Sequence, residues 1–220
     1  MVSGIALGAF TTLFVDRRLP DVDVGSQGNS QLILSRLEPA SGTYFGVNLD
    51  WSSVSPQAND ERLGHRAAVF VQFYNFPLGN DDLTNLVSLA NEVKTQNGML
   101  MVTLEPNTGL DAVTPQVAEV LANKLAEVNA AGVAVFVRFA HEINGSWYIW
   151  SQRPTAYVHA FQIVADAVHR LAPKTAMVWA PNYGGGYPFS GGAYEAKPGS
   201  PDFKLLDTNG DGKLSMEDDP

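Results

Sequence analysis

The sequence predicts an α/β fold built on parallel strands, and two observations carry that prediction. Five short segments, at residues 44–51, 67–74, 99–105, 133–142 and 175–180, have the length and the apolar or alternating composition of strands. Longer amphipathic segments of helical period separate the last four of them. Strands joined by helices of this length form parallel βαβ units.

Each of the three predicted helices repeats its apolar residues on one face and has a recognisable end. Asp81 and Asp82 open the first helix and Gly98 closes it. Gly132 ends the second, and Pro173 lies just beyond the third. The apolar faces are Leu83, Leu86, Val87, Ala90 and Val93, then Val117, Val120, Leu121, Leu125 and Val128, then Tyr157, Phe161, Val164, Val168 and Leu171.

Composition limits the possible classes of protein. The 220 residues are 45% hydrophobic and 17% charged, which is globular composition and enough chain for one domain with a core. The net charge of -9 argues against nucleic acid or an anionic membrane as a partner, because both require basic patches. The absence of cysteine excludes disulfides, thiol catalysis and cysteine metal sites.

The N-terminal residues 1–42 are expected to lie outside the folded domain of residues 43–220. Residues 1–15 are apolar or small, and Arg17 and Arg18 follow them, whereas a signal peptide has its basic residues first. Residues 16–42 are rich in Gly, Ser, Asp and Pro. We interpret this region as an arm or as the remnant of a leader.

The alternation of side chains along the strands favours an incomplete (β/α)8 TIM barrel of about five βα units. In the strand at 133–142, Val135 and Val137 share a face suited to the helices, and Arg138 and Glu142 share the other. Polar residues inside a parallel sheet are costly unless they serve a site, and barrel active sites lie at the C-terminal strand ends. The other residues predicted to face inward are Asn48, Asp50, Gln72, Thr103 and Glu105.

A doubly wound open sheet fits the same rhythm of strands and helices. As a nucleotide-binding fold it would require a glycine-rich phosphate turn after the first strand. Residues 51–60 contain no such turn.

The segment from Arg138 to Trp150 carries the main functional motif. A carboxyl group, Glu142, ends a strand, with His141 and Asn144 close by in sequence and Trp147 following. Aromatic faces suit the C–H faces of sugar rings, and a glycosidase needs one carboxylic acid to protonate the leaving oxygen and a second carboxylate as nucleophile or base.

This segment resembles glycoside hydrolase family 26, the β-mannanase family, whose members have an Arg-x-x-His-Glu-Met-Asn-Gly-x-Trp segment at the end of strand four. Ile143 stands where Met is usual, and the similarity extends to residues 46–51 and 179–182. The resemblance implies a secreted enzyme that cleaves a β-1,4-linked, mannan-type polysaccharide with retention. It implies Glu142 as acid/base and His141 beside it. The matching residues are Arg138, His141, Glu142, Asn144, Gly145 and Trp147.

Several of these residues have structural alternatives. Trp147 and Trp150 could be core residues instead of sugar platforms, and Arg138 could pair with Asp50 or Glu105. His141 and Glu142 could form a buried ion pair. The residues expected to bind substrate are Trp147, Trp150, Asn144, Trp179, Asn182, Asp50, Glu105 and Arg138.

A second motif at residues 207–218 matches an EF-hand-like calcium loop, interpreted as an insertion in the barrel. Gly212 permits the sharp turn, and a structural Ca²⁺ is expected, with no organic cofactor. Position 12 is Asp218 instead of the usual Glu, so its reach is shorter. The expected ligands are Asp207, Asn209, Asp211, the carbonyl of Lys213, and Asp218.

A full barrel has eight strands, and no position of this sequence receives the family's nucleophile, a Glu at the end of strand seven. We therefore interpret the chain as a fragment or partial gene model of a monomeric enzyme, inactive by itself. Two alternatives remain open: a non-catalytic carbohydrate-binding protein, and a calcium-dependent adhesion or docking module.

Overall fold

The computed structural model describes residue 39 and residues 42–219 of the chain, so the predicted arm at 1–42 lies almost wholly outside the described residues. Five parallel strands form one sheet in the order β1-β2-β3-β4-β5. They are β1 (Gly46–Asn48), β2 (Val69–Asn75), β3 (Met99–Glu105), β4 (Val135–Phe139) and β5 (Thr175–Val178). The predicted number, order and direction of the strands are confirmed, although several strands are shorter than predicted.

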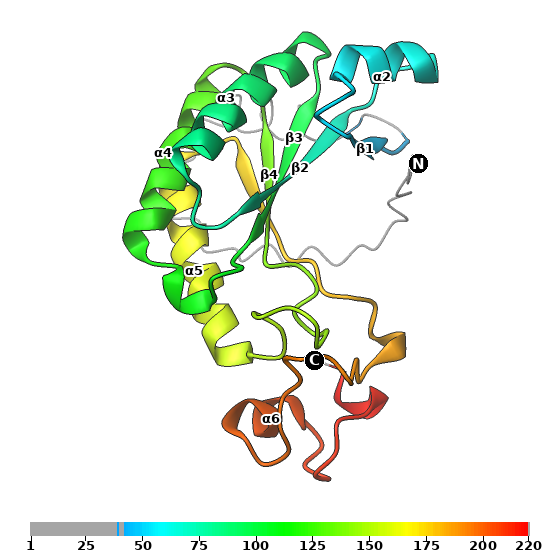
Figure 1. The fold of residues 1–220 in the computed structure, drawn as a ribbon, viewed down its shortest axis with the longest axis vertical. Helices are drawn as coiled ribbons and strands as arrows, with labels where there is room; N and C mark the ends of the chain where they lie inside the picture. Colours follow the sequence, from blue (N-terminus) through cyan, green and yellow to red (C-terminus); the bar gives the residue numbers. More distant parts are fainter. Residues whose placement is uncertain (1–38, 40–41, 220) are drawn as a thin grey trace, which may run out of the picture.

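The long helices cover one face of this sheet. Figure 1 shows α3 (Asn80–Thr95), α4 (Pro115–Ala130) and α5 (Pro154–Leu171) side by side on that face, and these are the three predicted helices. Two short helices were not predicted, α2 (Pro56–Leu63) and α6 (Pro201–Leu206). The 3₁₀ turns are η2 (Leu110–Ala112), η3 (Gly184–Gly186) and η4 (Met216–Asp218).

The unpredicted helix α2 is specified by its ends instead of by an apolar face. Ser55 accepts a hydrogen bond from the backbone N–H of Ala58 at 3.2 Å, and Pro56 occupies the first helical position. Gly64 ends the helix with a φ of 73°, a left-handed conformation that glycine adopts without steric cost. These signals lie in a polar stretch with little periodicity.

The register of the strands fixes which residues face the helices. Val102 of β3 pairs with Val137 of β4, and both are fully buried against the helical layer. Gln72 pairs with Val102 and therefore lies on the helix side of the sheet, so its predicted inward position is wrong. Phe73 pairs with Thr103, which pairs with Arg138, and these residues share the opposite face.

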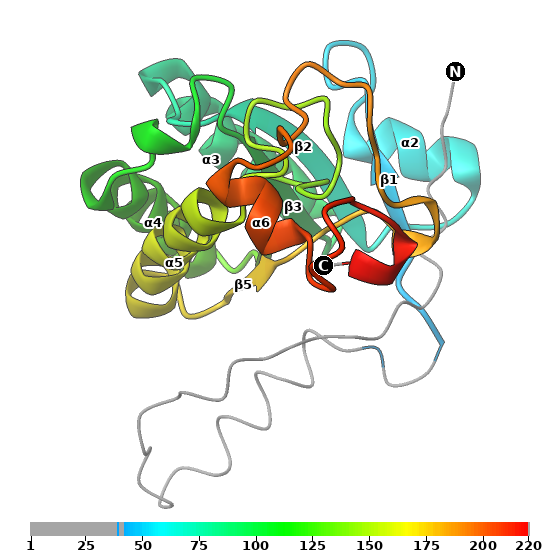
Figure 2. The same cartoon turned by 90° about the horizontal axis from the view of Figure 1, so that it is seen from below.

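Residues 183–219 pack at the C-terminal ends of the strands, where Figures 1 and 2 show α6 and the C-terminal turns beyond the edge of the sheet. Helix α6 contacts α5, and Phe203 and Leu206 form a second small core with Ala196. Residues 183–206, a stretch rich in Gly, Pro and aromatic residues, are not one extended surface loop, because they contain η3, α6 and the buried Tyr187. None of the described helices is long and apolar enough to cross a membrane.

Candidate functional site

The loop that follows β4, residues 140–152 (the β4 loop), has a strained backbone. Ala140, Glu142 and Gln152 have φ angles of 44°, 58° and 49°, which non-glycine residues rarely adopt. Each such residue costs about 1–3 kcal/mol and persists where the surrounding structure over-determines it, as at active sites. The strain lies at the strand end where the sequence places Glu142.

Hydrogen bonds hold the β4 loop in this shape. The indole N–H of Trp150 donates to the carbonyl of His141 at 2.8 Å, and the amide of Gln152 donates to the carbonyl of Ile143 at 2.7 Å. The amide of Glu142 donates to the carbonyl of Ala180, after β5, at 2.7 Å. Glu142 is thus fixed both within its own loop and to the neighbouring strand end.

The carboxylate of Glu142 is half-buried and is oriented by an aromatic side chain. Its Oε2 accepts a hydrogen bond from Nε1 of Trp147 at 2.9 Å. Trp147 is 43% exposed, so the same indole holds the carboxylate and presents surface to solvent. A Cβ at Gly145 would lie 2.6 Å from the Trp147 ring, which explains why glycine stands there.

His141 is 7% exposed and is enclosed by aromatic rings. Its ring meets those of Phe73, Tyr148 and Trp150 edge-on, with centroid distances of 6.0, 5.1 and 5.9 Å. Burial, and then the charge of Arg138, lower the pKa of His141 below 6.5, against a smaller opposite effect of Glu142. The imidazole is therefore neutral at pH 7. The alternative of a buried His141–Glu142 ion pair is not observed among the described residues.

Arg138 lies on the inward face, as its place in the strand predicts, but it does not form the expected ion pair with Asp50 or Glu105 in the described structure. Its Nε donates to Thr103 Oγ1 at 3.0 Å, and its guanidinium lies 5.2 Å from the centre of the Phe73 ring. Burial raises the pKa of Glu105, and the charge of Arg138 partly opposes that effect.

Asp50 is exposed and is engaged by its own turn. Its carboxylate accepts hydrogen bonds from the hydroxyls of Ser52 at 2.6 Å and Ser53 at 2.8 Å, and these bonds lower its pKa. No hydrogen bond in the described structure joins Asp50 to the β4 loop. The hydrogen bonds that Asp50 accepts thus stay within residues 50–54, and none of them links it to Glu142.

Two predicted substrate-binding residues have structural positions instead. Trp150 is fully buried, and its ring stacks on Tyr148 at 4.4 Å, so it has no face open to a ligand. Asn144 is 4% exposed and exchanges two hydrogen bonds with the backbone of Asn182, at 3.1 and 2.8 Å. This pair ties the β4 loop to the loop after β5, and neither Trp150 nor Asn144 is placed to touch a sugar.

Trp179 is 51% exposed but faces the helical layer. It follows Val178, which is in register with Arg138, so alternation turns Trp179 to the other side of the sheet. There it lines an apolar pocket of about 190 Å³ with Tyr157 and Val158 of α5 and with Leu206. The same pocket is also lined by Ile143, Asn144 and Gln152, so Trp179 lies beside the β4 loop but on the helix side of the sheet.

Tyr148 and Phe73 lie at the site but were not among the residues predicted for it from the sequence. Tyr148 is half-buried, and its hydroxyl lies 3.3 Å from Nε2 of His141. Phe73 is 37% exposed on the inward face, where its ring contacts both His141 and Arg138. Tyr148 could have been predicted from the run of aromatic residues that follows Trp147. Phe73 could have been predicted only by knowing which residues of β2 face inward.

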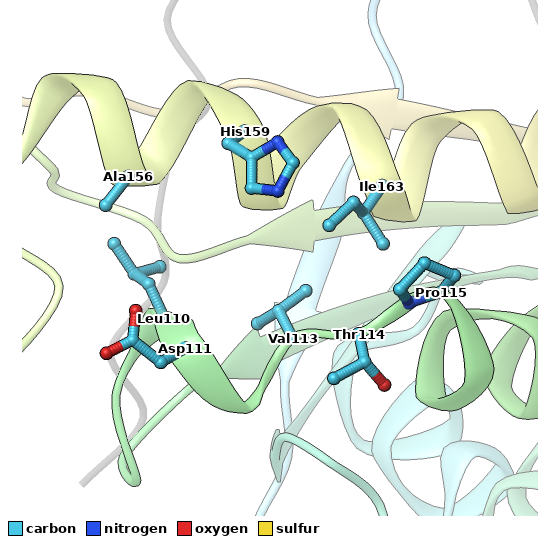
Figure 3. A pocket seen from close by; sticks show the side chains of 8 residues that line it. All are labelled: Leu110, Asp111, Val113, Thr114, Pro115, Ala156, His159 and Ile163. Atoms are coloured by element: carbon cyan, nitrogen blue, oxygen red, sulfur yellow. The ribbon is translucent and has the colours of Figure 1, made fainter.

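A second cavity lies on the outside of the fold. It has a volume of about 330 Å³ and opens between η2 and α5, as Figure 3 shows. None of the residues predicted for the functional site lines it. Its walls are Leu110, Asp111, Val113, Thr114, Pro115, Ala156, His159 and Ile163.

The acidic segment, residues 207–218, is folded largely by its own backbone amides. Asp207 accepts from the N–H of Gly212 at 2.9 Å, and Gly212 has the predicted left-handed φ of 81°. Asp218 is buried, and its two oxygens accept from the amides of Asn209 and Ser215 at 3.2 and 2.8 Å. Burial alone would raise its pKa, but these hydrogen bonds outweigh burial and lower it.

The residues of the acidic segment do not form a ready cation cage. Among the described residues, no group of three or more His, Asp or Glu side chains is arranged to hold a metal ion. One observation leaves room for a cation: Oδ1 of Asp207 is buried and has no hydrogen-bond partner.

The comparisons with known proteins agree with the fold. No family model and no curated protein matches the chain. The solved structure of GH26A from Muricauda sp. MAR_2010_75 superposes with a TM-score of 0.54 at 17% identity, covering 79% of this chain and 72% of that one. The Bacillus subtilis mannanase man26 gives a TM-score of 0.45 at 17% identity, and 60% of its length is covered. The parallel order of the five strands is that of part of a (β/α) barrel, a fold shared with the Muricauda protein.

Proposed function

We propose that the chain belongs to a glycoside hydrolase related to family 26, acting on a β-1,4-linked mannan, with Glu142 as the catalytic acid/base. One observation carries the proposal: a carboxylate at the C-terminal end of a parallel strand is oriented by the indole of a half-exposed tryptophan, Trp147. Barrel active sites lie at this end of the strands, and aromatic faces bind sugar rings. The similarity to a solved GH26 structure supports the fold that this site requires.

The geometry suggests how these groups would act. Trp147 fixes the Oε2 atom of Glu142, so the remaining oxygen, Oε1, can carry the proton that is delivered to the leaving glycosidic oxygen. Arg138, near the end of β4, places a positive charge close enough to Glu142 to interact with it electrostatically.

Retaining hydrolysis also requires a second carboxyl group about 5–5.5 Å from the first. The family resemblance assigns this nucleophile to a residue that the sequence does not contain. We therefore expect the 220-residue chain to bind mannan fragments without cleaving them. Cleavage by the chain itself would mean that the second carboxylate lies among Asp50, Glu105 and the acidic residues of the loops, and that the assignment of the nucleophile by family resemblance is wrong.

Binding is tested by isothermal titration of the purified chain with β-1,4-mannotetraose, with cellotetraose and xylotetraose as alternatives. We expect mannotetraose to bind, and Trp147→Ala to weaken binding by about 10-fold or more, because a sugar–aromatic contact is lost. Trp179→Ala is the matched control, since this exposed tryptophan faces α5. An equal loss in both variants, or no binding of any of the three sugars, would contradict the proposal.

We also propose that the acidic segment binds one structural Ca²⁺, which favours a secreted protein. The buried, unpartnered Oδ1 of Asp207 supports this, together with the oxygen-rich spacing of the segment. Asp207, Asn209, Asp211 and the carbonyl of Lys213 would hold the ion, and Asp218 would have to share its oxygens with the backbone amides that it now accepts. Calorimetric titration with CaCl₂ tests the proposal, with Asp211→Ala as the non-binding variant. If the folded chain shows no heat of binding at millimolar calcium, this proposal is wrong.

A further inference from the structure

Tyr148 is held more rigidly than an exposed loop tyrosine requires. Its ring stacks on the fully buried Trp150 at 4.4 Å with an interplanar angle of 8°. Its amide donates to Ser151 Oγ at 3.2 Å. The position of the phenol is therefore set by the core of the β4 loop, although the residue itself is only half-buried.

The hydroxyl of Tyr148 lies 3.3 Å from Nε2 of His141, and the direction of this hydrogen bond depends on the imidazole tautomer. Nδ1 of His141 is buried and has no partner among the described residues. A buried N–H without an acceptor is rarer in proteins than an under-satisfied acceptor. The unpartnered Nδ1 therefore favours the neutral tautomer with its hydrogen on Nε2, in which that N–H would donate to the phenol oxygen of Tyr148.

With its oxygen accepting from His141, the phenol keeps its own O–H free to donate elsewhere. Burial, followed by the charges of Glu142 and Glu105, raises the pKa of Tyr148, so the phenol is protonated and lies in the field of both carboxylates. No hydrogen bond joins its hydroxyl to either carboxylate in the described structure. An oriented donor beside the candidate acid is thus left without an acceptor.

We propose that Tyr148 is a ligand-binding residue, which accepts a hydrogen bond from His141 Nε2–H and donates its O–H to a hydroxyl of the sugar bound next to Glu142. The sugar part of this inference rests on the proposed function, whereas the hydrogen bond from His141 does not. The two parts can therefore be tested separately.

The hydrogen bond is tested by ¹⁵N NMR of the imidazole nitrogens at pH 7.5, with a His141→Gln spectrum to assign the signals. We expect His141 to be the Nε2–H tautomer in the native chain, and its Nε2 resonance to shift in Tyr148→Phe. A dominant Nδ1–H tautomer would mean that Tyr148 donates to His141, and this would overturn the inference whatever sugar binding shows.

The ligand contact is tested by titrating native, Tyr148→Phe and Tyr194→Phe chains with β-1,4-mannotetraose. Loss of one hydrogen bond to the sugar should weaken binding by about 3- to 10-fold in Tyr148→Phe. Tyr194 is the control, because it is exposed on the loop after β5 and has no assigned role in binding. Native binding with an unchanged Tyr148→Phe affinity would overturn this inference alone. If the native chain binds no sugar, the proposed function and the ligand contact both fall.

Discussion

The β4 loop and the acidic segment were both recognised from spaced polar residues, but the folded chain uses their carboxylates differently. Glu142 accepts one hydrogen bond, from a side chain, and stays half-exposed. Asp218 is buried, and both of its oxygens accept backbone amides. The carboxylate of Glu142 can therefore accept further hydrogen bonds from a ligand. The oxygens of Asp218 already accept the hydrogen bonds that fold its own segment. A motif match therefore has to be weighed by which of its groups remain unsatisfied, and in the acidic segment Oδ1 of Asp207 is such a group.

The largest effect that this comparison predicts concerns Glu142. In a form of the protein that carries the second carboxylate, β-mannan hydrolysis should fall by about 10²- to 10⁴-fold in Glu142→Gln, because the proton donor is lost. The measurement is reducing-sugar release from the polymer. Glu217→Gln makes the same change in the acidic segment and should leave the rate unchanged. A similar loss of hydrolysis rate in Glu142→Gln and Glu217→Gln would show that Glu142 has no special role compared with a carboxylate of the acidic segment.

A smaller effect is expected at Gly145. A Cβ there would lie 2.6 Å from the Trp147 ring, so Gly145→Ala should lower the free energy of unfolding by about 1–3 kcal/mol. It should also weaken mannotetraose binding, because the indole must leave Glu142. Urea unfolding and calorimetry measure the two effects. Gly79→Ala is the control, since its added Cβ meets Asp82 at an ordinary 3.6 Å.

Calcium should act through the acidic segment alone. With a dissociation constant typical of extracellular sites, about 10⁻⁴ to 10⁻³ M, 10 mM Ca²⁺ should stabilise the chain by about 1.4–2.7 kcal/mol. Thermal unfolding with CaCl₂ or EDTA measures this shift. Asp211→Ala should abolish it, whereas Glu142→Gln should retain it. A shift of the same size in Asp211→Ala would place the ion elsewhere.

The smallest expected effect is the pH dependence that His141 contributes. Burial and Arg138 hold its folded-state pKa below the 6.5 of an exposed histidine. The unfolded chain therefore binds this proton more readily, so the free energy of unfolding falls as the pH drops below about 6.5. The fall between pH 7.5 and 5.5 should be shallower in His141→Gln. Equal slopes in the two proteins would show that His141 does not resist protonation.

The sheet could be predicted from the sequence because apolar runs and helical periods are local signals. All five strands and the three long helices followed from them. Helix α2 was missed because its end caps define it, and Gln72 was misplaced because its polarity was taken to indicate the inward face. The register with Val102 shows the reverse.

The candidate site was harder to predict because loops have no period. The motif located His141, Glu142 and Trp147, but nothing local distinguishes the exposed Trp147 from the buried Trp150 three residues later. Their difference depends on tertiary packing, because Trp150 belongs to the main hydrophobic core and Trp147 is exposed. The hydrogen bonds of Asp50 within its own turn could have been predicted from the sequence, because serines two and three residues after an Asp favour such a turn.

The reciprocal hydrogen bonds between Asn144 and Asn182 have a dynamic consequence. The backbone N–H of Asn182 donates to Oδ1 of Asn144 in the β4 loop. It can therefore exchange with deuterium only when the β4 loop and the loop after β5 separate. The exchange rate of this one backbone amide therefore reports how often the two loops separate at the candidate site. It can be measured without substrate. The two loops should exchange with a common protection factor, and replacing Asn144 should release both together.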